Sequence, residues 1–163
     1  MNLKCTKIVL DKLKIDTKNM KTNLVLNPFL NNWHCNILKF GRTNTILLTH
    51  DKTLYSFFLS GYKSDDFKKF DFCIKEDIFK IMYSLNFSQK QVEIILQSME
   101  NITYSKTNDK SVLASMTQIK RMIESCVYRG DDLIDINARI NTMPLKVLEY
   151  GSSDEEFKKF LDS

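Results

Sequence analysis

The stretch TNDKSVLASMTQIKRMIESCV, residues 107–127, carries the clearest helix signal in the chain, and the rest of the sequence is interpreted around it. Asn108 or Asp109 is placed to cap this helix, and apolar residues then recur every three or four positions. Arg129 and Gly130 end it with a cation in the last turn followed by glycine. The predicted buried stripe consists of Val112, Leu113, Met116, Ile119, Ile123 and Val127.

The first turn of this helix is the first candidate binding site. A helix N-terminus offers unpaired N–H groups and partial positive charge, which together suit an anion. Ser111 and Ser115 lie one turn apart on a shared face. An acidic cap at Asp109 would satisfy the same N–H groups and repel an anion, so capping competes with ligand binding. The candidate residues are Thr107, Asn108, Lys110, Ser111 and Ser115.

Ahead of this helix the sequence predicts an antiparallel meander, because apolar runs of strand length alternate with short turns. The three strands span residues 33–40, 45–49 and 53–59. Trp33 begins the first strand, either as a buried anchor or as an exposed stacking platform. Asn36 is unexpected within a strand, because a buried amide needs hydrogen-bond partners. Trp33 and Asn36 form the second candidate binding site.

Helices are expected on both sides of this β region in the sequence. Their predicted starts are Thr6, Asp65, Ser88, Asp109, Asp131 or Asp132, and Ser153. Residues 102–106 should add an edge strand. The expected fold is therefore α+β, with five or six helices on a small, mostly antiparallel sheet made of the meander and one or two edge strands. The length fits a single domain over residues 1–150, followed by a tail helix at 151–163.

The composition excludes several classes of protein. No apolar run approaches the length of a membrane span, and no signal-peptide core is present, so we expect a cytoplasmic protein without membrane contact. The cysteines lie far apart without a CxxC pair, which favours buried free thiols and no metal site. They are Cys5, Cys35, Cys73 and Cys126.

The two histidines do not complete a catalytic motif. His34 and Cys35 are neighbours on a strand, so their side chains point to opposite faces. His50 lies in a turn and is expected to be exposed. The sequence contains no glycine-rich phosphate loop and no GxSxG elbow, so we expect no cofactor. These absences argue against an enzyme without excluding one.

Positive charge is concentrated in the first part of the chain. Residues 1–63 hold ten Lys or Arg against three Asp, whereas the remainder holds fourteen against seventeen Asp or Glu. Such asymmetry suits nucleic acid or an acidic protein, or is simply solvated surface. Only four of the 24 basic residues are Arg, the side chain that favours bidentate phosphate contacts. The candidate polyanion contacts are Lys4, Lys7, Lys12, Lys14, Lys18, Lys21, Lys39 and Arg42.

Four segments resemble the motifs of an uncharacterised family of small bacterial domains of unknown function. They are C-T-K-I (5–8), W-H-C-N (33–36), T-N-D-K-S-V-L-A-S-M-T-Q (107–118) and N-T-M-P-L (141–145). The family pattern reads T-K-K, W-Y-A-N, N-R-S-V-L-G-S-M-N-D and T-P-M/L. Asp109-Lys110, Ala114 and Thr117-Gln118 depart from it. The resemblance implies no established activity, but it points to the same two candidate sites and to a bacterial or phage origin.

Three functions remain open at this stage. The first is a non-catalytic protein that binds a host protein, such as a phage or mobile-element inhibitor of a host defence factor. The second is nucleic-acid binding through the basic residues of the first part of the chain. The third is a small-ligand or enzyme site at the start of the 107–127 helix. The oligomeric state is not predicted.

Overall fold

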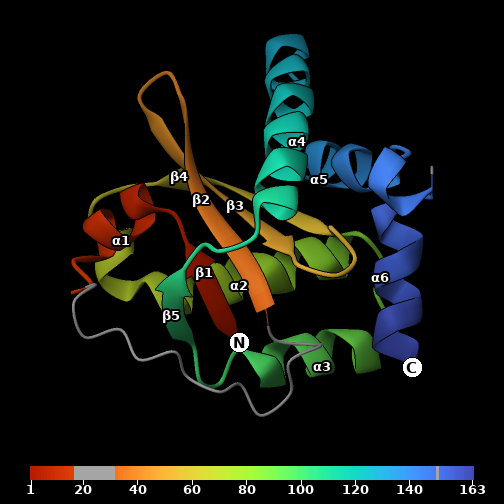
Figure 1. The fold of residues 1–163 in the computed structure, drawn as a ribbon, viewed down its shortest axis with the longest axis horizontal. Coiled ribbons are helices and arrows are strands. Elements are labelled where there is room, and N and C mark those ends of the chain that lie inside the picture. Colours follow the sequence, from red (N-terminus) through yellow and green to blue (C-terminus); the bar gives the residue numbers. More distant parts are fainter. Residues whose placement is uncertain (17–31, 150) are drawn as a thin grey trace.

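The computed structural model describes residues 1–16, 32–149 and 151–163, and in that part of the chain a five-stranded sheet is packed between helices (Figure 1). The strands are β1 (Asn2–Cys5), β2 (Asn32–Phe40), β3 (Thr43–His50), β4 (Ser56–Tyr62) and β5 (Thr103–Lys106). The helices are α1 (Lys7–Leu13), α2 (Phe70–Ser84), α3 (Gln89–Ser98), α4 (Lys110–Arg129), α5 (Leu133–Thr142) and α6 (Ser153–Asp162). Two short 3₁₀ helices, η2 (Asp66–Lys69) and η3 (Lys146–Leu148), complete this set.

The predicted α+β class is confirmed, and the sheet is mixed. Its strand order is β4-β3-β2-β1-β5. The meander β2-β3-β4 is antiparallel, as expected, whereas β1 lies between β2 and β5 and runs parallel to both. Parallel neighbours cannot be joined by a tight hairpin. Strand β5 is reached from β4, at the other edge of the sheet, through η2, α2 and α3. The expectation of a mostly antiparallel sheet therefore overlooked β1 as a central strand.

The helix boundaries follow the local capping signals. Ser88 and Gln91 form the predicted capping box of α3, and Asp109 and Asp132 cap α4 and α5. Gly130 ends α4 with a φ of 81°, the left-handed conformation that glycine adopts most easily. The helical region after Asp65 begins with the 3₁₀ helix η2 and continues as α2 from Phe70.

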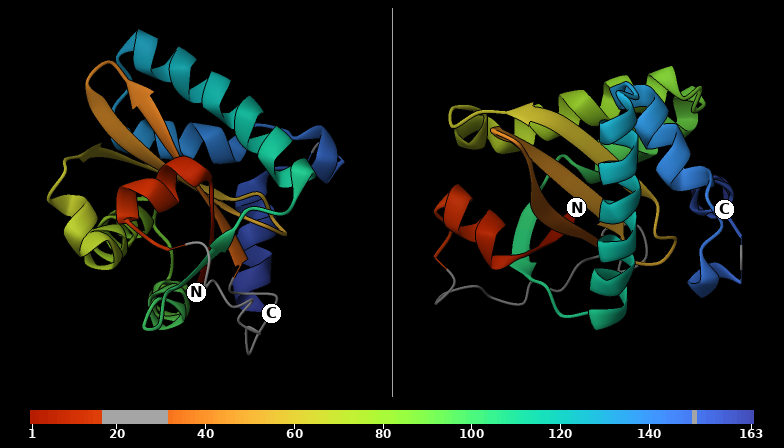
Figure 2. Two further views of the ribbon diagram at one scale, coloured as in Figure 1. Left: turned by 60° about the vertical axis from the view of Figure 1, so that its left-hand side comes forward. Right: turned by 90° about the horizontal axis from the view of Figure 1, so that it is seen from above.

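The two faces of the sheet are covered unequally. One face packs against α1, α2, α3 and α6 and forms the larger core, which includes Leu3, Trp33 and Phe57. The opposite face packs against α4 and α5 through a smaller core that includes Leu47 and Phe58. Figures 1 and 2 show the sheet lying between α2 and α4. The second face also carries buried polar strand residues, among them His34, Thr49 and Ser56.

Helix α6 docks on its own domain through an aromatic cluster. Phe157 is fully buried, and its ring stacks on Tyr55 at a centroid distance of 4.4 Å and meets Trp33 edge-on at 5.7 Å. His50 joins the same cluster at 5.6 Å from Phe157. The expectation that His50 is exposed was wrong, because β3 extends through His50 and α6 covers its ring.

Helix α5 covers part of the outer edge of β4 with two asparagine side chains. The amide of Asn141 accepts a hydrogen bond from the backbone N–H of Ser56 and donates one to its carbonyl, both at 2.8 Å. Asn137 makes the same pair of bonds to Phe58, at 2.9 and 2.8 Å. Because an open edge strand invites pairing with other chains, these amides substitute for a sixth strand over this part of β4.

Candidate functional site

The polar first turn of α4 is organised mainly as a helix cap. The carboxylate of Asp109 accepts hydrogen bonds from the N–H groups of Ser111 and Val112, at 2.8 and 3.2 Å. Ser115 is buried and donates its hydroxyl proton to the Ser111 carbonyl. Capping and internal hydrogen bonds therefore account for Asp109 and Ser115, and a bound anion would meet the charge of Asp109. The remaining candidates there are half-buried or exposed: Thr107, Asn108, Lys110 and Ser111.

The second predicted pair, Trp33 and Asn36, is divided between the two faces of the sheet. Trp33 is fully buried in the larger core, where its ring stacks near Phe57 at 5.5 Å. Asn36 is half-buried on the opposite face, and Thr6 donates a hydrogen bond to its side-chain oxygen at 2.9 Å. Trp33 acts as an anchor of the fold, and Asn36 links β2 to the start of α1.

Those of the predicted polyanion contacts that the structure describes lie in different surroundings rather than on one continuous basic surface. Lys18 and Lys21 lie outside the described residues. Lys4 is paired with Asp51, and the ammonium group of Lys12 lies over the ring of Phe67 at 5.5 Å. The others are exposed and divided between α1 with its C-cap and the β2–β3 hairpin: Lys7, Lys14, Lys39 and Arg42.

A row of polar side chains crosses the whole sheet on the face that α4 and α5 cover. Strand register places its members directly opposite one another from β4 to β5. In that order they are Ser56, Thr49, His34, Lys4 and Ser105. The Thr49 and Ser56 hydroxyls lie 2.8 Å apart. Sequence reasoning missed this polar row because no local pattern reveals which residues of five separate strands are neighbours.

Asp51, which follows β3, binds two members of the polar row. Its Oδ1 lies 2.7 Å from Nδ1 of His34 and its Oδ2 lies 2.5 Å from Nζ of Lys4. A carboxylate only accepts hydrogen bonds, so Nδ1 of His34 carries a proton. His34 is fully buried, and its Nε2 has no hydrogen-bond partner in the part of the chain that the structure describes. The carboxylate therefore fixes the orientation of a buried imidazole.

The charge of Asp51 is maintained by its partners. Burial alone would raise the pKa of this carboxyl group, but hydrogen bonds from His34 and Lys4 and their positive charge outweigh burial. The net pKa of Asp51 is lowered, and the group stays ionised at neutral pH. The negative charge of Asp51 is thus compensated by Lys4 and His34. The three side chains together join β1, β2 and the end of β3.

The outer face of α2, defined by Phe72, Glu76, Phe79 and Tyr83, exposes three aromatic side chains. The three aromatic residues are 64%, 43% and 75% exposed, although residues such as Ile78 on the opposite side of the helix are buried. Helical spacing aligns the four residues in one stripe. Glu76 has no ion-pair or hydrogen-bond partner among the described residues. Aligned exposed aromatics of this kind usually mark a contact surface.

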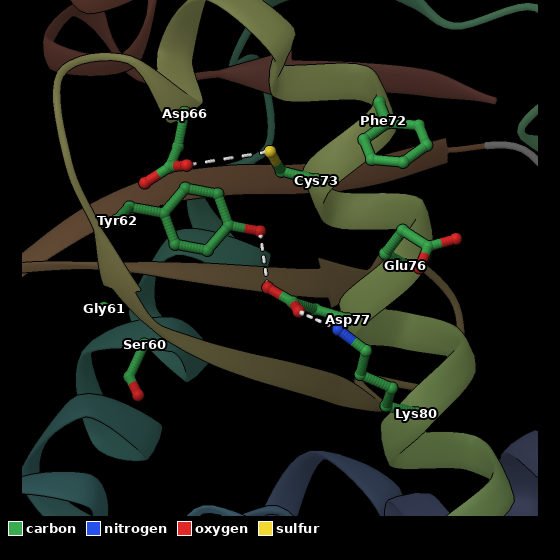
Figure 3. Close-up of a pocket in the computed structure, with 9 residues that line it drawn as sticks. All are labelled: Ser60, Gly61, Tyr62, Asp66, Phe72, Cys73, Glu76, Asp77 and Lys80. Carbon is green, nitrogen blue, oxygen red and sulfur yellow. Dashed lines mark hydrogen bonds and ion pairs between the residues drawn. The ribbon is translucent and has the colours of Figure 1, made fainter.

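A hollow of about 280 Å³ lies between the end of β4 and α2 (Figure 3). Tyr62 donates a hydrogen bond to Asp77 at 3.0 Å, and the Cys73 thiol points at Asp66. Burial and the nearby Asp77 charge raise the pKa of Tyr62, so this phenol stays protonated. We name this space the acidic hollow; it is lined by Ser60, Gly61, Tyr62, Asp66, Phe72, Cys73, Glu76, Asp77 and Lys80.

A second hollow, of about 300 Å³, lies on the other side of β4. Its walls are mainly apolar side chains of the smaller core and its rim, so we name it the apolar hollow. The apolar walls are Phe40, Phe58, Val127, Leu133 and Ile136, and the polar lining residues are Thr43, Thr45, Ser60 and Asp131. Val127 was predicted to be buried but is 38% exposed, because the last turn of α4 reaches the rim of this hollow. Ser60 lines both hollows, which therefore meet at the outer edge of β4.

These features define a mixed α+β domain with a largely paired sheet edge and one aromatic helix face. The chain belongs to the family of the domain of unknown function DUF6933, whose model matches residues 2–156. The resemblance to an uncharacterised domain family is thus confirmed over nearly the whole chain. No curated protein and no solved structure is significantly similar. Among the described residues, no helix has the length and apolar character needed to cross a bilayer.

Proposed function

We propose that this domain is a non-catalytic binding protein that contacts another protein through the outer face of α2. The observation that carries the proposal is the exposure of Phe72, Phe79 and Tyr83 in one stripe. Aromatic side chains dominate the energetic centres of protein interfaces, where single residues contribute about 2 kcal/mol or more. An isolated domain gains no stability by leaving such side chains in water.

The chemistry of the stripe suits a partner with an apolar surface and a basic group. The Phe79 and Tyr83 rings are already stacked, with centroids 6.3 Å apart, so little side-chain freedom is lost on binding. Glu76 adds one carboxylate between Phe72 and Phe79. A lysine or arginine of the partner would pair with it, and the surrounding aromatics would exclude water from that pair.

The identity of the partner is a finer part of the same proposal. We propose a host protein as partner, for a phage or mobile-element protein that inhibits a host defence factor in the cytoplasm of a bacterial cell. The small size of the domain and its composition rich in Lys, Asn and Ile support this origin. Its four cysteines are free thiols, which supports a reducing compartment.

Nucleic-acid binding is the second candidate function. It is supported by exposed cations on α1 and the β2–β3 hairpin, which have no ion-pair partner among the described residues. They are Lys7, Lys14, Lys39 and Arg42. A gel shift with 30-nucleotide single- and double-stranded DNA and RNA at low salt tests it. Binding that weakens steeply with salt and with a Lys39→Glu/Arg42→Glu variant would favour this function over protein binding.

The main proposal is tested by affinity capture from a lysate of the source organism, followed by binding measurements with the purified captured protein. The double variant Phe79→Ser/Tyr83→Ser should bind about 30-fold or more weakly, because two aromatic contacts are lost. Tyr128→Ser is the matched control, since Tyr128 is 94% exposed on α4, outside the α2 stripe. Equal binding of all three proteins, or no reproducible partner, would contradict the proposal.

A further inference from the structure

Helix α5 runs along the outer edge of β4 and pairs with most of its outward-facing backbone groups. One residue of this part of the edge, Ser60, is left unpaired among the described residues. Backbone groups of alternate residues point away from β3, and those of Ser56 and Phe58 are paired by the two asparagine amides. The next outward-facing residue is Ser60. The α5 residue one turn before Asn137 is Leu133, which has no amide, so the asparagine pairing stops short of Ser60.

The open segment is short. Beyond Ser60 the register with β3 shifts, and Gly61 adopts a φ of 89°, which few other residues tolerate. A bulge of this kind turns an edge away from further strand pairing. Ser60 itself is exposed, so one outward-facing backbone N–H and one C=O remain available to another chain.

We infer that Ser60 pairs with an extended segment of the partner protein, which places an apolar side chain in the apolar hollow and a basic side chain in the acidic hollow. The inference rests on the proposed protein-binding function and gives the chemistry of its partner. Successive side chains of an extended chain point to opposite faces. Because the two hollows lie on opposite faces of β4 and meet at Ser60, neighbouring partner residues reach one hollow each.

Charge decides which side chain enters which hollow. The acidic hollow holds the carboxylates of Asp66, Glu76 and Asp77 against the single cation Lys80, which is 3.7 Å from Asp77. An arginine or lysine there would neutralise Glu76 and meet the ring of Phe72. The apolar hollow is also lined by Asp131, but that carboxylate is already paired with Arg129 and Arg139, at 2.7 and 3.6 Å. Its apolar walls, among them Phe58 and Leu133, therefore suit an aliphatic or aromatic side chain.

The acidic hollow is continuous with the outer face of α2, because Phe72 and Glu76 belong to both. A partner segment that pairs with Ser60 would therefore be followed by contacts on Phe79 and Tyr83. Strand addition to a sheet edge, with alternate side chains in pockets, is a general mode of peptide recognition that obtains affinity from the backbone and specificity from the side chains.

The test uses a displayed library of random peptides of about twelve residues, selected on the whole 163-residue chain. Enriched peptides should share an apolar residue next to Lys or Arg. Ser60→Pro should weaken their binding at least tenfold, because it removes the outward N–H. Lys106→Pro is the matched control, since its N–H faces away from β1 at the other edge of the sheet and its loss should leave binding unchanged.

Two further variants test the same peptide contacts if Ser60→Pro fails to fold. Leu133→Asn extends the asparagine pairing to Ser60 and should also weaken peptide binding about tenfold. Glu76→Lys should select against basic residues and weaken binding about three- to tenfold, whereas Glu100→Lys should not. No enriched peptide, or peptides that bind Ser60→Pro and Leu133→Asn like the wild type, would overturn the inference. If such peptides still lose binding in Phe79→Ser/Tyr83→Ser, the proposed function survives and only the strand pairing fails.

Discussion

At the scale of single residues, Asp51 connects parts of the sheet that are remote in sequence. It binds Lys4 of β1 and His34 of β2 through its two oxygens. Both partners are largely buried, with side-chain exposures of 15% and 0%. Removing one member of such a cluster leaves the others poorly solvated, which costs more than the pair itself contributes.

Replacing the carboxylate of this cluster should destabilise the protein. We expect Asp51→Asn to lower the free energy of unfolding by about 1–3 kcal/mol, because Lys4 then loses its counter-ion. Urea unfolding measures the change. Asp65→Asn is the control: its ion pair with Lys68 is exposed, and its loss should cost less than about 1 kcal/mol. An equal effect of the two substitutions would contradict the role given to Asp51.

The effect of Asp51→Asn should also depend on pH in a defined direction. The pKa of Asp51 is lower in the folded protein than the ordinary value of about 3.9, so the stabilising contribution is complete above about pH 4. It is lost as the pH falls through the folded-state pKa. The difference in Tm between the wild type and Asp51→Asn should therefore shrink below about pH 4. A difference that widens on acidification would be incompatible with this electrostatic account.

At the scale of elements, the ten residues of α5 both contribute to the smaller core and pair with the edge of β4. Its apolar side, including Ile136 and Ile140, contributes to the smaller core. Asn137 and Asn141, one turn apart and almost fully buried, pair with the backbone of β4. Asparagine is a modest helix former, so this placement is explained by edge pairing rather than by helix propensity.

Removing one of these amides should lower the free energy of unfolding, because part of the edge of β4 then loses its hydrogen-bond partners. Asn137→Ala leaves the N–H and C=O of Phe58 buried without partners, and we expect the free energy of unfolding to fall by about 2–4 kcal/mol. Asn108→Ala removes an exposed amide and should change stability by no more than about 0.5 kcal/mol. Thermal unfolding with light scattering would also detect association through the opened edge. Unchanged stability of Asn137→Ala would rule out edge pairing as a stabilising contact.

At the scale of the whole molecule, the last helix completes the core that the first strand begins. Phe157 of α6 packs against Trp33, Tyr55 and Phe87, and the same core contains Leu3 of β1. Helices α3 and α6 are also joined by a hydrogen bond from Gln91 to Asp162. Folding of the sheet and docking of α6 should therefore be one cooperative event.

This cooperativity gives a prediction for the aromatic cluster. Phe157→Ala should lower the free energy of unfolding by about 3–5 kcal/mol, because a fully buried ring leaves a cavity. Fluorescence of Trp33 and far-ultraviolet circular dichroism should report the same shifted transition. Tyr128→Ala, at an exposed ring, serves as the control with little change expected. Separate transitions by the two probes would show instead that α6 docks independently.

Part of the candidate binding surface could be read from the sequence. Phe72, Phe79 and Tyr83 recur at helical spacing on the side opposite Ile74, Ile78 and Ile81. This pattern predicts an exposed aromatic face on the helix. The predicted binding sites were instead the start of α4 and the Trp33–Asn36 pair. In the structure, capping and core packing account for most of those polar and aromatic groups. The two hollows depend on β4, α2, α4 and α5 together, so no single stretch contained them.

The local elements could be predicted from the sequence: the meander, the capping box of α3, the glycine end of α4 and the amphipathic helices. Their causes act between residues a few positions apart, through periodicity, caps and turn residues. Three features depend on packing between distant segments: β1 lies between two parallel neighbours, Asp51 joins Lys4 to His34, and Asn137 covers the edge of β4. Those contacts join residues that are 17 to 101 positions apart. At such separations many pairings satisfy the same local pattern, and only global packing selects one.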